Sequence, residues 1–178
     1  MPLPNIDTNR IESRIKWLVE ELGPRTHQSK SGQLAALGAK DILEKSGWEV
    51  QTVQLHGNIV ACRGTGAKIF LAHTDTVHKS PGAVDNASGV VALLELANIS
   101  QSKDMCLAFP VAEELGLLGS KQMAALVHKW HPDPSKIEIV VSLDLVGHGD
   151  LWVTGLSQKW GNEQISWLFE HADIQSEY

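Results

Sequence analysis

The sequence has little of what marks membrane-bound or secreted proteins. No apolar run reaches the roughly 18 residues that a membrane-spanning helix requires, and residues 1–17 lack the apolar core of a secretory signal. Only two cysteines are present, Cys62 and Cys106. Both lie in apolar strand-like runs, where buried reduced thiols are favoured over a disulfide. We therefore expect a cytoplasmic protein, unless a leader peptide has been removed.

Positive charge is also scarce. The chain carries 15 Lys and Arg against 21 Asp and Glu, a net charge of -6, and no short window gathers more than a few basic residues. That balance argues against a nucleic-acid or anionic membrane surface and indicates a small solute or a peptide as the partner. At 178 residues the chain, 1–178, fits one domain. A domain of this size buries a core large enough to fold without a structural metal ion, so a bound metal here would have a catalytic role.

Helical and strand-like apolar patterns alternate along most of the chain. Helical spacing covers 8–22, 31–47, 87–99, 117–130 and, at the end, 158–178. Strand patterns cover 48–55, 58–63, 68–72, 105–111 and 137–145. The succession of strand, helix, strand, helix and strand after residue 68 predicts an α/β fold with parallel central strands.

Polar residues follow the central strands at the point where each strand ends: His73, Asp75, Glu113, Glu114 and Asp144. Ligands of open α/β sheets bind outside the carboxyl ends of the strands, so we expect all five side chains at one edge. Alone, a His at a strand end is usually a hydrogen-bonded structural residue, and an Asp before a helix is usually a cap. Carboxylates that converge on an imidazole would repel one another unless a cation neutralised them. The set therefore predicts a divalent metal site.

Two pairs within this set have complementary chemistry. His73 and Asp75 are two apart on a strand and project from the same face, so Asp75 can accept the second ring N–H of a metal-bound His73. Of the adjacent Glu113 and Glu114, one can bind metal while the other, with a raised pKa, holds the attacking water as a general base. Mixed nitrogen and oxygen ligands favour zinc, with cobalt or manganese as substitutes, and disfavour calcium.

Four segments carry the residues of the expected site: 71–75 (LAHTD), 82–89 (GAVDNASG), 112–120 (AEELGLLGS) and 143–145 (LDL). Together they resemble the motifs of metallopeptidase family twenty-eight, the di-zinc exopeptidases that include bacterial leucyl aminopeptidases. Upstream, Leu22-Gly23-Pro24-Arg25 and the helix at 31–47 also resemble the family, so the resemblance covers about residues 10–150. It implies a three-layer αβα fold of the phosphorylase/zinc-exopeptidase type. The central sheet would be mixed and mostly parallel, here without its last strand or strands.

The resemblance also implies roles for the site residues. It implies four metal ligands, one base and one residue that orients a ligand: His73 and Asp144 on one zinc, Asp85 bridging two zinc ions, Glu114 on the second, Glu113 as general base and Asp75 behind His73. It further implies a cis peptide at Asp85–Asn86. The implied activity is the release of N-terminal residues from peptides with a free N-terminus, and it leaves homo-oligomerisation open.

One ligand of that family has no counterpart in this sequence. The second zinc of the family has a His ligand far downstream, beyond another helix and strand, and this sequence ends at Tyr178 before such a region. Among the seven His residues other than His73, only His78 and His148 lie near the strand ends, and neither occupies the family's position. We therefore expect a complete first site with three protein ligands and a second site that keeps only Asp85 and Glu114.

Other functions stay open at this point. A glutaminyl-cyclase-like acyl transfer would suit a site with a single zinc, although the segments around Asp85 and Glu113 resemble the peptidase pattern more. A carboxypeptidase that acts on acidic dipeptides is also compatible, because no specificity-pocket residue distinguishes it. From a different class, the chain could be a metal-binding or partner-binding domain without turnover.

Overall fold

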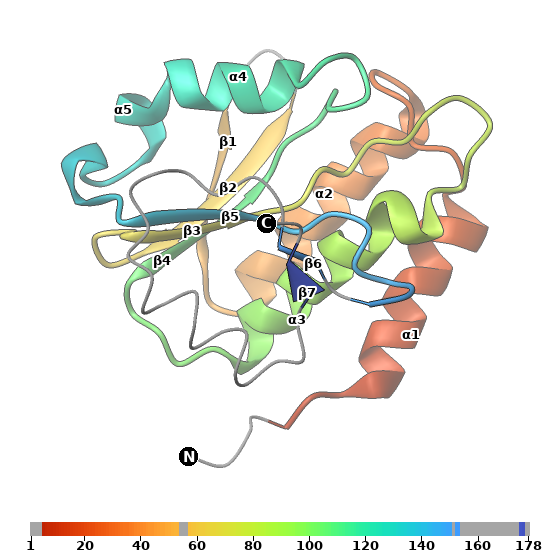
Figure 1. The fold of residues 1–178 in the computed structure, drawn as a ribbon, viewed down its shortest axis with the longest axis horizontal. Coiled ribbons are helices and arrows are strands. Elements are labelled where there is room, and N and C mark those ends of the chain that lie inside the picture. The colour runs from red at the N-terminus through yellow and green to blue at the C-terminus, as the bar shows by residue number, and fades with distance from the viewer. Residues whose placement is uncertain (1–4, 54–56, 151, 154–174, 177–178) are drawn as a thin grey trace. The chain divides into compact units, whose positions relative to one another are not determined.

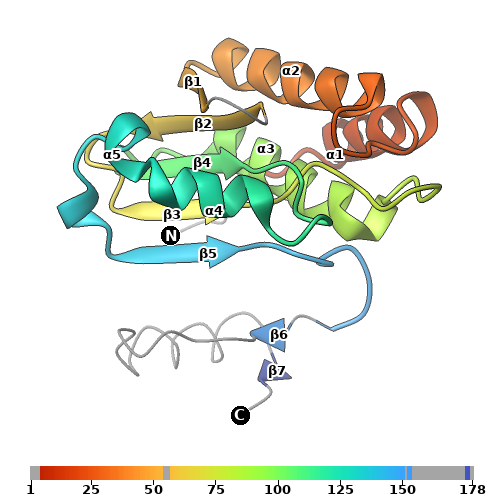
Figure 2. The same cartoon turned by 90° about the horizontal axis from the view of Figure 1, so that it is seen from above.

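A five-stranded sheet forms the centre of the fold (Figure 1). The structure is a computed structural model, and it describes residues 5–53, 57–150, 152–153 and 175–176. The strands of this sheet are β1 (Glu49–Val53), β2 (Asn58–Arg63), β3 (Lys68–Leu71), β4 (Met105–Phe109) and β5 (Ile139–Ser142). They lie in the order β1-β2-β4-β3-β5, which can be followed across the sheet in Figure 2.

The sheet is mixed, and its parallel strands are the ones that carry the predicted site residues. β3 pairs in parallel with β4 on one side and with β5 on the other. β2 is antiparallel to both β1 and β4, so four of the five strands point the same way. The carboxyl ends of β3, β4 and β5 therefore meet at one edge. This confirms the predicted α/β class and the mixed, mostly parallel sheet.

Helices cover both faces of the sheet. They are α1 (Thr8–Lys16), α2 (Lys30–Lys45), α3 (Gly89–Ile99), α4 (Leu118–Ala125) and α5 (Val127–Trp130). The helix predicted at 8–22 is α1 continued by a π-helical turn, η1 (Trp17–Glu21). The helix predicted at 117–130 is broken at Leu126, whose φ of -107° and ψ of 16° separate α4 from α5. The helix predicted at 87–99 begins at Gly89, because Ala83–Ser88 form a separate turn, η2.

Successive side chains of a strand point to opposite faces of the sheet, so alternate strand residues pack into two separate cores. Strand residues facing α1, α2 and α3 are Ile59, Ala61, Met105, Leu107 and Phe109. Strand residues on the opposite face, packed with Met123 of α4 and Trp130 of α5, include Val60, Ile69, Cys106 and Ala108. The result is three layers, helices on sheet on helices (Figure 1).

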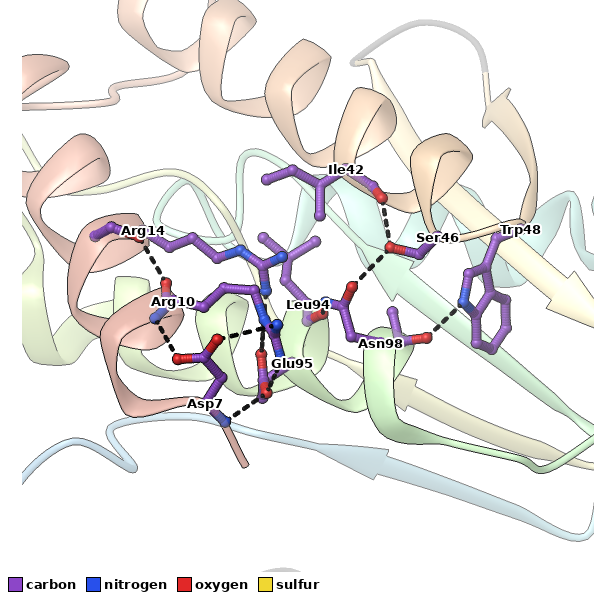
Figure 3. Close-up of polar contacts among 11 residues, drawn as sticks. Asp7, Arg10, Arg14, Ile42, Ser46, Trp48, Leu94, Glu95 and Asn98 are labelled. Atoms are coloured by element: carbon purple, nitrogen blue, oxygen red, sulfur yellow. Dashed lines mark hydrogen bonds and ion pairs between the residues drawn. The ribbon is translucent and has the colours of Figure 1, made fainter. Parts of the chain in front are cut away.

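An ion-pair network fastens α1 to α3 (Figure 3). The Glu95 side chain, 4% exposed, accepts hydrogen bonds from Nε of Arg10 at 2.7 Å and from Nη2 of Arg10 at 2.5 Å. Nη1 of Arg14 lies 3.5 Å from the same carboxylate, and the backbone N–H of Asp7 donates to it at 3.1 Å. Glu95 is therefore a buried carboxylate whose partners, within the part of the chain that the structure describes, come from the N-terminal segment.

The prediction of two reduced cysteines is wrong. Cys62 on β2 and Cys106 on β4 form a disulfide, with their Cα atoms 4.1 Å apart. The two residues are direct partners in the antiparallel register of β2 and β4, which the apolar pattern of each run alone does not reveal. Disulfides of this kind are typical of oxidising compartments, and the cytoplasmic location stays a prediction.

Contacts within the chain define two compact units, residues 1–147 and residues 148–178. The first contains the sheet, the five helices and every predicted site residue. In the second, β6 (Trp152–Val153) pairs in parallel with β7 (Gln175–Ser176), so the helix predicted to run to Tyr178 is wrong at 175–176. The rest of that helix, 158–174 and 177–178, lies outside the described residues. The single-domain organisation stays a prediction, and no helix among the described residues has the length and apolarity to cross a membrane.

Candidate metal centre

Hydrogen bonds beyond the strand ends hold the site segments side by side. The backbone N–H of Thr74, after β3, donates to the carbonyl of Pro110, after β4, at 3.0 Å. The backbone N–H of Leu143, after β5, donates to the carbonyl of Leu71 at 2.8 Å. The three segments that carry the predicted residues therefore leave the sheet together, and their side chains converge.

His73, Asp85 and Asp144 form the centre of the site. Nε2 of His73 lies 3.1 Å from Oδ1 of Asp85 and 3.6 Å from Oδ1 of Asp144. One nitrogen or oxygen from each residue lies within 4.8 Å of the others, and among the described residues this is the one group of three such side chains. The His73 side chain is 4% exposed, whereas each carboxylate is 47% exposed. The three residues assigned to the first zinc by resemblance are thus brought together, and their role as ligands stays a prediction.

Three buried polar atoms in this site have no hydrogen-bond partner among the described residues: Nε2 of His73, Oδ1 of Asp85 and Oε1 of Glu114. Buried polar atoms are nearly always paired, so such a cluster requires an explanation. A divalent cation would satisfy these atoms, and a donor set of one imidazole and several carboxylates suits zinc. The residues present therefore fit the metal that the resemblance implies.

Asp75 lies behind His73 and also holds the segment that follows β4. Its Oδ1 lies 3.5 Å from Nδ1 of His73, and its backbone carbonyl oxygen lies 3.1 Å from the same nitrogen. Its two carboxylate oxygens accept the backbone N–H groups of Glu113 at 3.1 Å and of Glu114 at 3.2 Å. Burial acts to raise the pKa of Asp75, but the hydrogen bonds from His73 and these N–H groups outweigh it and hold that pKa below its usual range.

The His73 ring is in its positively charged form, with both nitrogens protonated, in the metal-free site at neutral pH. Burial acts to lower the pKa of His73, but the hydrogen bond with Asp75 and the negative charges of Asp75, Asp144 and Glu113 outweigh it and raise that pKa to about 9. The protonated ring then supplies part of the positive charge that the carboxylates need. A metal ion would compete with this proton for Nε2.

Glu113 and Glu114 both reach the site, although adjacent strand residues face opposite ways. Ala112, directly before them, has a φ of 58° in the left-handed region, which ends the strand alternation. Oε2 of Glu113 lies 4.0 Å from Nε2 of His73. Burial raises the pKa of Glu114, and the negative charge of Asp85 raises it further. Glu114 is only partly buried, but its Oε1 is buried without a hydrogen-bond partner among the described residues, which suits an atom that faces a cation.

The loop before α3 contains the predicted cis peptide, Asp85–Asn86, which the structure confirms. Sequence reasoning did not single out Asn86, which is 1% exposed. Its Nδ2 donates to the carbonyl of Leu143 at 2.8 Å, and its Oδ1 accepts the backbone N–H of Gly89 at 3.1 Å. Asn86 thus ties the start of α3 to the segment that carries Asp144. In the sequence, the only indication of this role was the polar amide of Asn86 directly after Asp85.

The histidines expected to lie outside the site divide into those the structure describes and those it does not. His131 is buried, with Nε2 2.9 Å from the carbonyl of Gly66, and its Nδ1 accepts the backbone N–H of Asp133, so it has a structural role. His78 does not belong to the three-residue group, and His148 belongs to the second compact unit. His56 and His171 lie outside the described residues.

Comparison with known proteins now tests the resemblance. Residues 58–172 match the model of Peptidase family M28. The chain belongs to peptidase family M28. The match includes every predicted site residue from His73 to Asp144, and the fold is like that of a zinc-dependent exopeptidase and a zinc aminopeptidase with solved structures.

Proteins similar to this M28 chain in sequence or in fold include more than one kind of enzyme. The aminopeptidase YwaD of Bacillus subtilis is 30% identical over 148 residues, which cover 81% of this chain and 31% of that protein. The LapA aminopeptidase of Legionella pneumophila has a TM-score of 0.80 at 19% identity, over 96% of this chain and 54% of that chain. A glutaminyl cyclase of Bacteroides thetaiotaomicron has a TM-score of 0.78 at 21% identity, over 97% of this chain and 74% of that chain.

Two facts limit what these likenesses say about the reaction. The chain spans about a third of the length of YwaD and about half of that of LapA. Structural likeness at this level of identity establishes the fold, and both peptidases and a cyclase have it. The choice of reaction therefore depends on the residues of the site.

Proposed function

We propose that this chain carries the metal site of a zinc-dependent aminopeptidase, which hydrolyses the N-terminal residue from peptides. The main support is the convergence of Nε2 of His73 with Oδ1 of Asp85 and Oδ1 of Asp144 from three segments of the chain. Two of these atoms, on His73 and Asp85, are buried without a partner among the described residues. Membership of family M28 and the likeness to YwaD favour peptide hydrolysis as the chemistry.

His73, Asp85 and Asp144 would hold the first zinc, and Asp85 and Glu114 would contribute to the second. When bound, zinc lowers the pKa of a shared water and polarises the scissile carbonyl. Among the described residues, no His other than His73 forms a group of three potential ligands with Asp85, and Glu114 belongs to none. We therefore propose that the first position binds zinc more tightly than the second.

Glu113 would move the proton. Its carboxylate is 30% exposed and lies 4.0 Å from Nε2 of His73, so it faces the centre where the attacking water would lie. It would take the proton from that water and pass it to the nitrogen of the leaving amine. Asp75 would keep the proton of His73 on Nδ1, so that Nε2 presents its lone pair to the site.

A zinc titration with an activity assay tests this proposal. Metal-free protein should release the chromophore from aminoacyl p-nitroanilides only after zinc is added, and a chelator should abolish that release. The same substrates with an acetylated amino group should not be cleaved, because an exopeptidase requires the free N-terminus. Equal cleavage of acetylated substrates would contradict the aminopeptidase proposal, and zinc binding without hydrolysis would favour a binding domain.

A glutaminyl-cyclase-like reaction is the second candidate. It is favoured by the single three-residue group that the described residues offer and by the shared fold with the Bacteroides cyclase. A peptide that begins with Gln separates the two reactions. Cyclisation releases ammonia and leaves a pyroglutamyl peptide, whereas hydrolysis releases free glutamine, and mass spectrometry distinguishes the products.

A further inference from the structure

Arg25 is a buried cation that the proposed reaction does not use. It follows the end of η1, is 1% exposed and is among the largest fully buried side chains. Burial lowers the pKa of Arg25 to about 10, with the charge of Asp75 acting in the opposite direction, so the guanidinium is charged at neutral pH. A buried charge is costly unless hydrogen bonds satisfy it. The partners of Arg25 therefore indicate what it is for.

Among the described residues the guanidinium donates to five acceptors, and all of them are backbone carbonyls. Nε donates to Thr74 at 3.1 Å, Nη1 to Leu18 at 2.8 Å, to Gly23 at 3.1 Å and to Pro81 at 2.7 Å, and Nη2 to Gly82 at 3.1 Å. In addition, the backbone N–H of Arg25 donates to Oγ1 of Thr76 at 2.9 Å. Arg25 thus joins the segment of η1 and Gly23 to the segment after β3 and to the loop before η2.

The second and third of these segments carry the two closest members of the metal centre. Thr74 lies between His73 and Asp75, and Gly82 is three residues before Asp85. One guanidinium therefore holds the backbone on both sides of the 3.1 Å contact between His73 and Asp85.

The loop at Gly82 lies directly against this guanidinium. Gly82 has a φ of 59°, and a Cβ added there would lie 2.9 Å from Nη2 of Arg25 and 2.3 Å from Cγ2 of Thr76. There is no free space between the loop and the guanidinium. A shift of Arg25 would therefore be transmitted to the backbone that leads to Asp85.

We propose that Arg25 is a positioning residue: by holding the carbonyls of Thr74, Pro81 and Gly82, it sets the spacing between His73 and Asp85 and thereby the affinity for zinc. The inference rests on the zinc site of the proposed function. Lysine cannot replace Arg25 in this role, because its three N–H groups radiate from one point, whereas the planar guanidinium presents five donors as a fork. Both side chains carry the same charge, so the substitution tests geometry.

The test compares Arg25→Lys with Arg63→Lys. Arg63 is a matched control, since its guanidinium also donates to two backbone carbonyls, those of Ser46 at 3.1 Å and Ser100 at 3.3 Å, and neither segment carries a predicted ligand. Zinc affinity is measured by competition with a chromophoric chelator. We expect Arg25→Lys to bind zinc about tenfold or more weakly, the loss typical of residues that support ligands. Arg63→Lys should bind zinc as the unchanged chain does.

A second readout separates positioning from a role in folding alone. Zinc raises the melting temperature by an amount set by its affinity for the folded state. A residue that only stabilises the fold lowers the melting temperature with and without zinc alike, and leaves the zinc-induced rise unchanged. Positioning predicts a smaller zinc-induced rise in Arg25→Lys than in Arg63→Lys. If Arg25→Lys is unfolded in plain buffer, the same melts are made in trimethylamine N-oxide, which strengthens folding of every variant.

The outcomes differ for the inference and for the function on which it rests. Weaker zinc binding with a reduced zinc-induced rise, confined to Arg25→Lys, supports positioning. A lower melting temperature with unchanged zinc affinity and an unchanged rise would overturn it and leave Arg25 a residue of the core. No zinc binding by the unchanged chain would overturn the zinc site itself, and the inference with it.

Discussion

The carboxylate of Asp75 accepts a hydrogen bond from the backbone N–H of Glu113 at 3.1 Å. The same carboxylate accepts the N–H of Glu114 and lies 3.5 Å from Nδ1 of His73. Asp75 therefore connects the ring of the candidate zinc ligand to the backbone that carries the candidate base. A residue in this place affects both parts of the site at once.

Asp75→Asn should weaken zinc binding by about 10–100-fold, because an amide removes the negative charge that faces His73. The amide also has a single acceptor oxygen for the two backbone N–H groups of Glu113 and Glu114. Chelator competition measures the affinity. Asp104→Asn is the matched control. Asp104 also accepts a backbone N–H, that of Ala67 at 3.2 Å, and it does not belong to the site. Equal zinc affinities in the two variants would contradict the role of Asp75.

Glu113 and Glu114 should respond differently to the same substitution. Glu113→Gln should reduce turnover by about 10²–10⁴-fold, the usual contribution of a general base, with nearly unchanged zinc content. Glu114→Gln should lose zinc from the second position, because its buried Oε1 has no other partner among the described residues. Zinc per chain and the rate of aminoacyl p-nitroanilide cleavage are measured together. Loss of metal in Glu113→Gln would reassign Glu113 as a ligand.

The sequence predicted the parts of this site that depend on local pattern. Apolar runs located β3, β4 and β5, and the polar residues that follow them do converge, because parallel strands place their carboxyl ends at one edge. The disulfide was missed because its two cysteines are paired by the register of β2 with β4, which neither run encodes alone. Arg25 and Asn86 were missed for the same reason, since their partners are carbonyls distant in sequence.

Acid should destabilise the metal-free protein partly through Glu95, the centre of the network in Figure 3. The pKa of Glu95 is lowered, chiefly by the hydrogen bond from Arg10. Burial acts to raise it, but the N–H of Asp7 and the charges of Arg10 and Arg14 add to the lowering. A lowered folded-state pKa contributes stability above the unfolded value, and that stability is lost as pH falls through the folded-state pKa. Urea unfolding between pH 7 and pH 3 should therefore show a steeper loss in the unchanged chain than in Glu95→Gln.

At pH 7, Glu95→Gln should lower the free energy of unfolding by about 2–3 kcal/mol, since it breaks a buried pair whose Arg10 side is partly screened by solvent. Asp41→Asn is the control. Asp41 pairs with Lys45 at 2.6 Å, but the two side chains are 57% and 74% exposed, so this variant should be nearly neutral. A neutral Glu95→Gln would show that the network does not stabilise the docking of α1 on α3.

Gly119 should tolerate no side chain, because α4 starts against the end of β4 at this point. An added Cβ would lie 2.0 Å from the carbonyl oxygen of Val111 and 2.5 Å from Oδ1 of Asn58, which itself accepts the N–H of Val111 at 2.9 Å. Gly119→Ala should lower the free energy of unfolding by about 3 kcal/mol or more through overpacking. It should also weaken turnover, since Val111 is two residues before Glu113.

Gly116→Ala separates the close contact at Gly119 from a general cost of alanine in this loop. Gly116 has a φ of 85° and nothing within 4 Å of an added Cβ, so only its backbone conformation opposes a side chain. That conformation costs about 1–2 kcal/mol for a residue with a Cβ. Urea unfolding of both variants without metal gives the comparison. If Gly119→Ala is no less stable than Gly116→Ala, α4 can move away from β4, and the close packing of α4 on the strand end does not fix the position of Glu113.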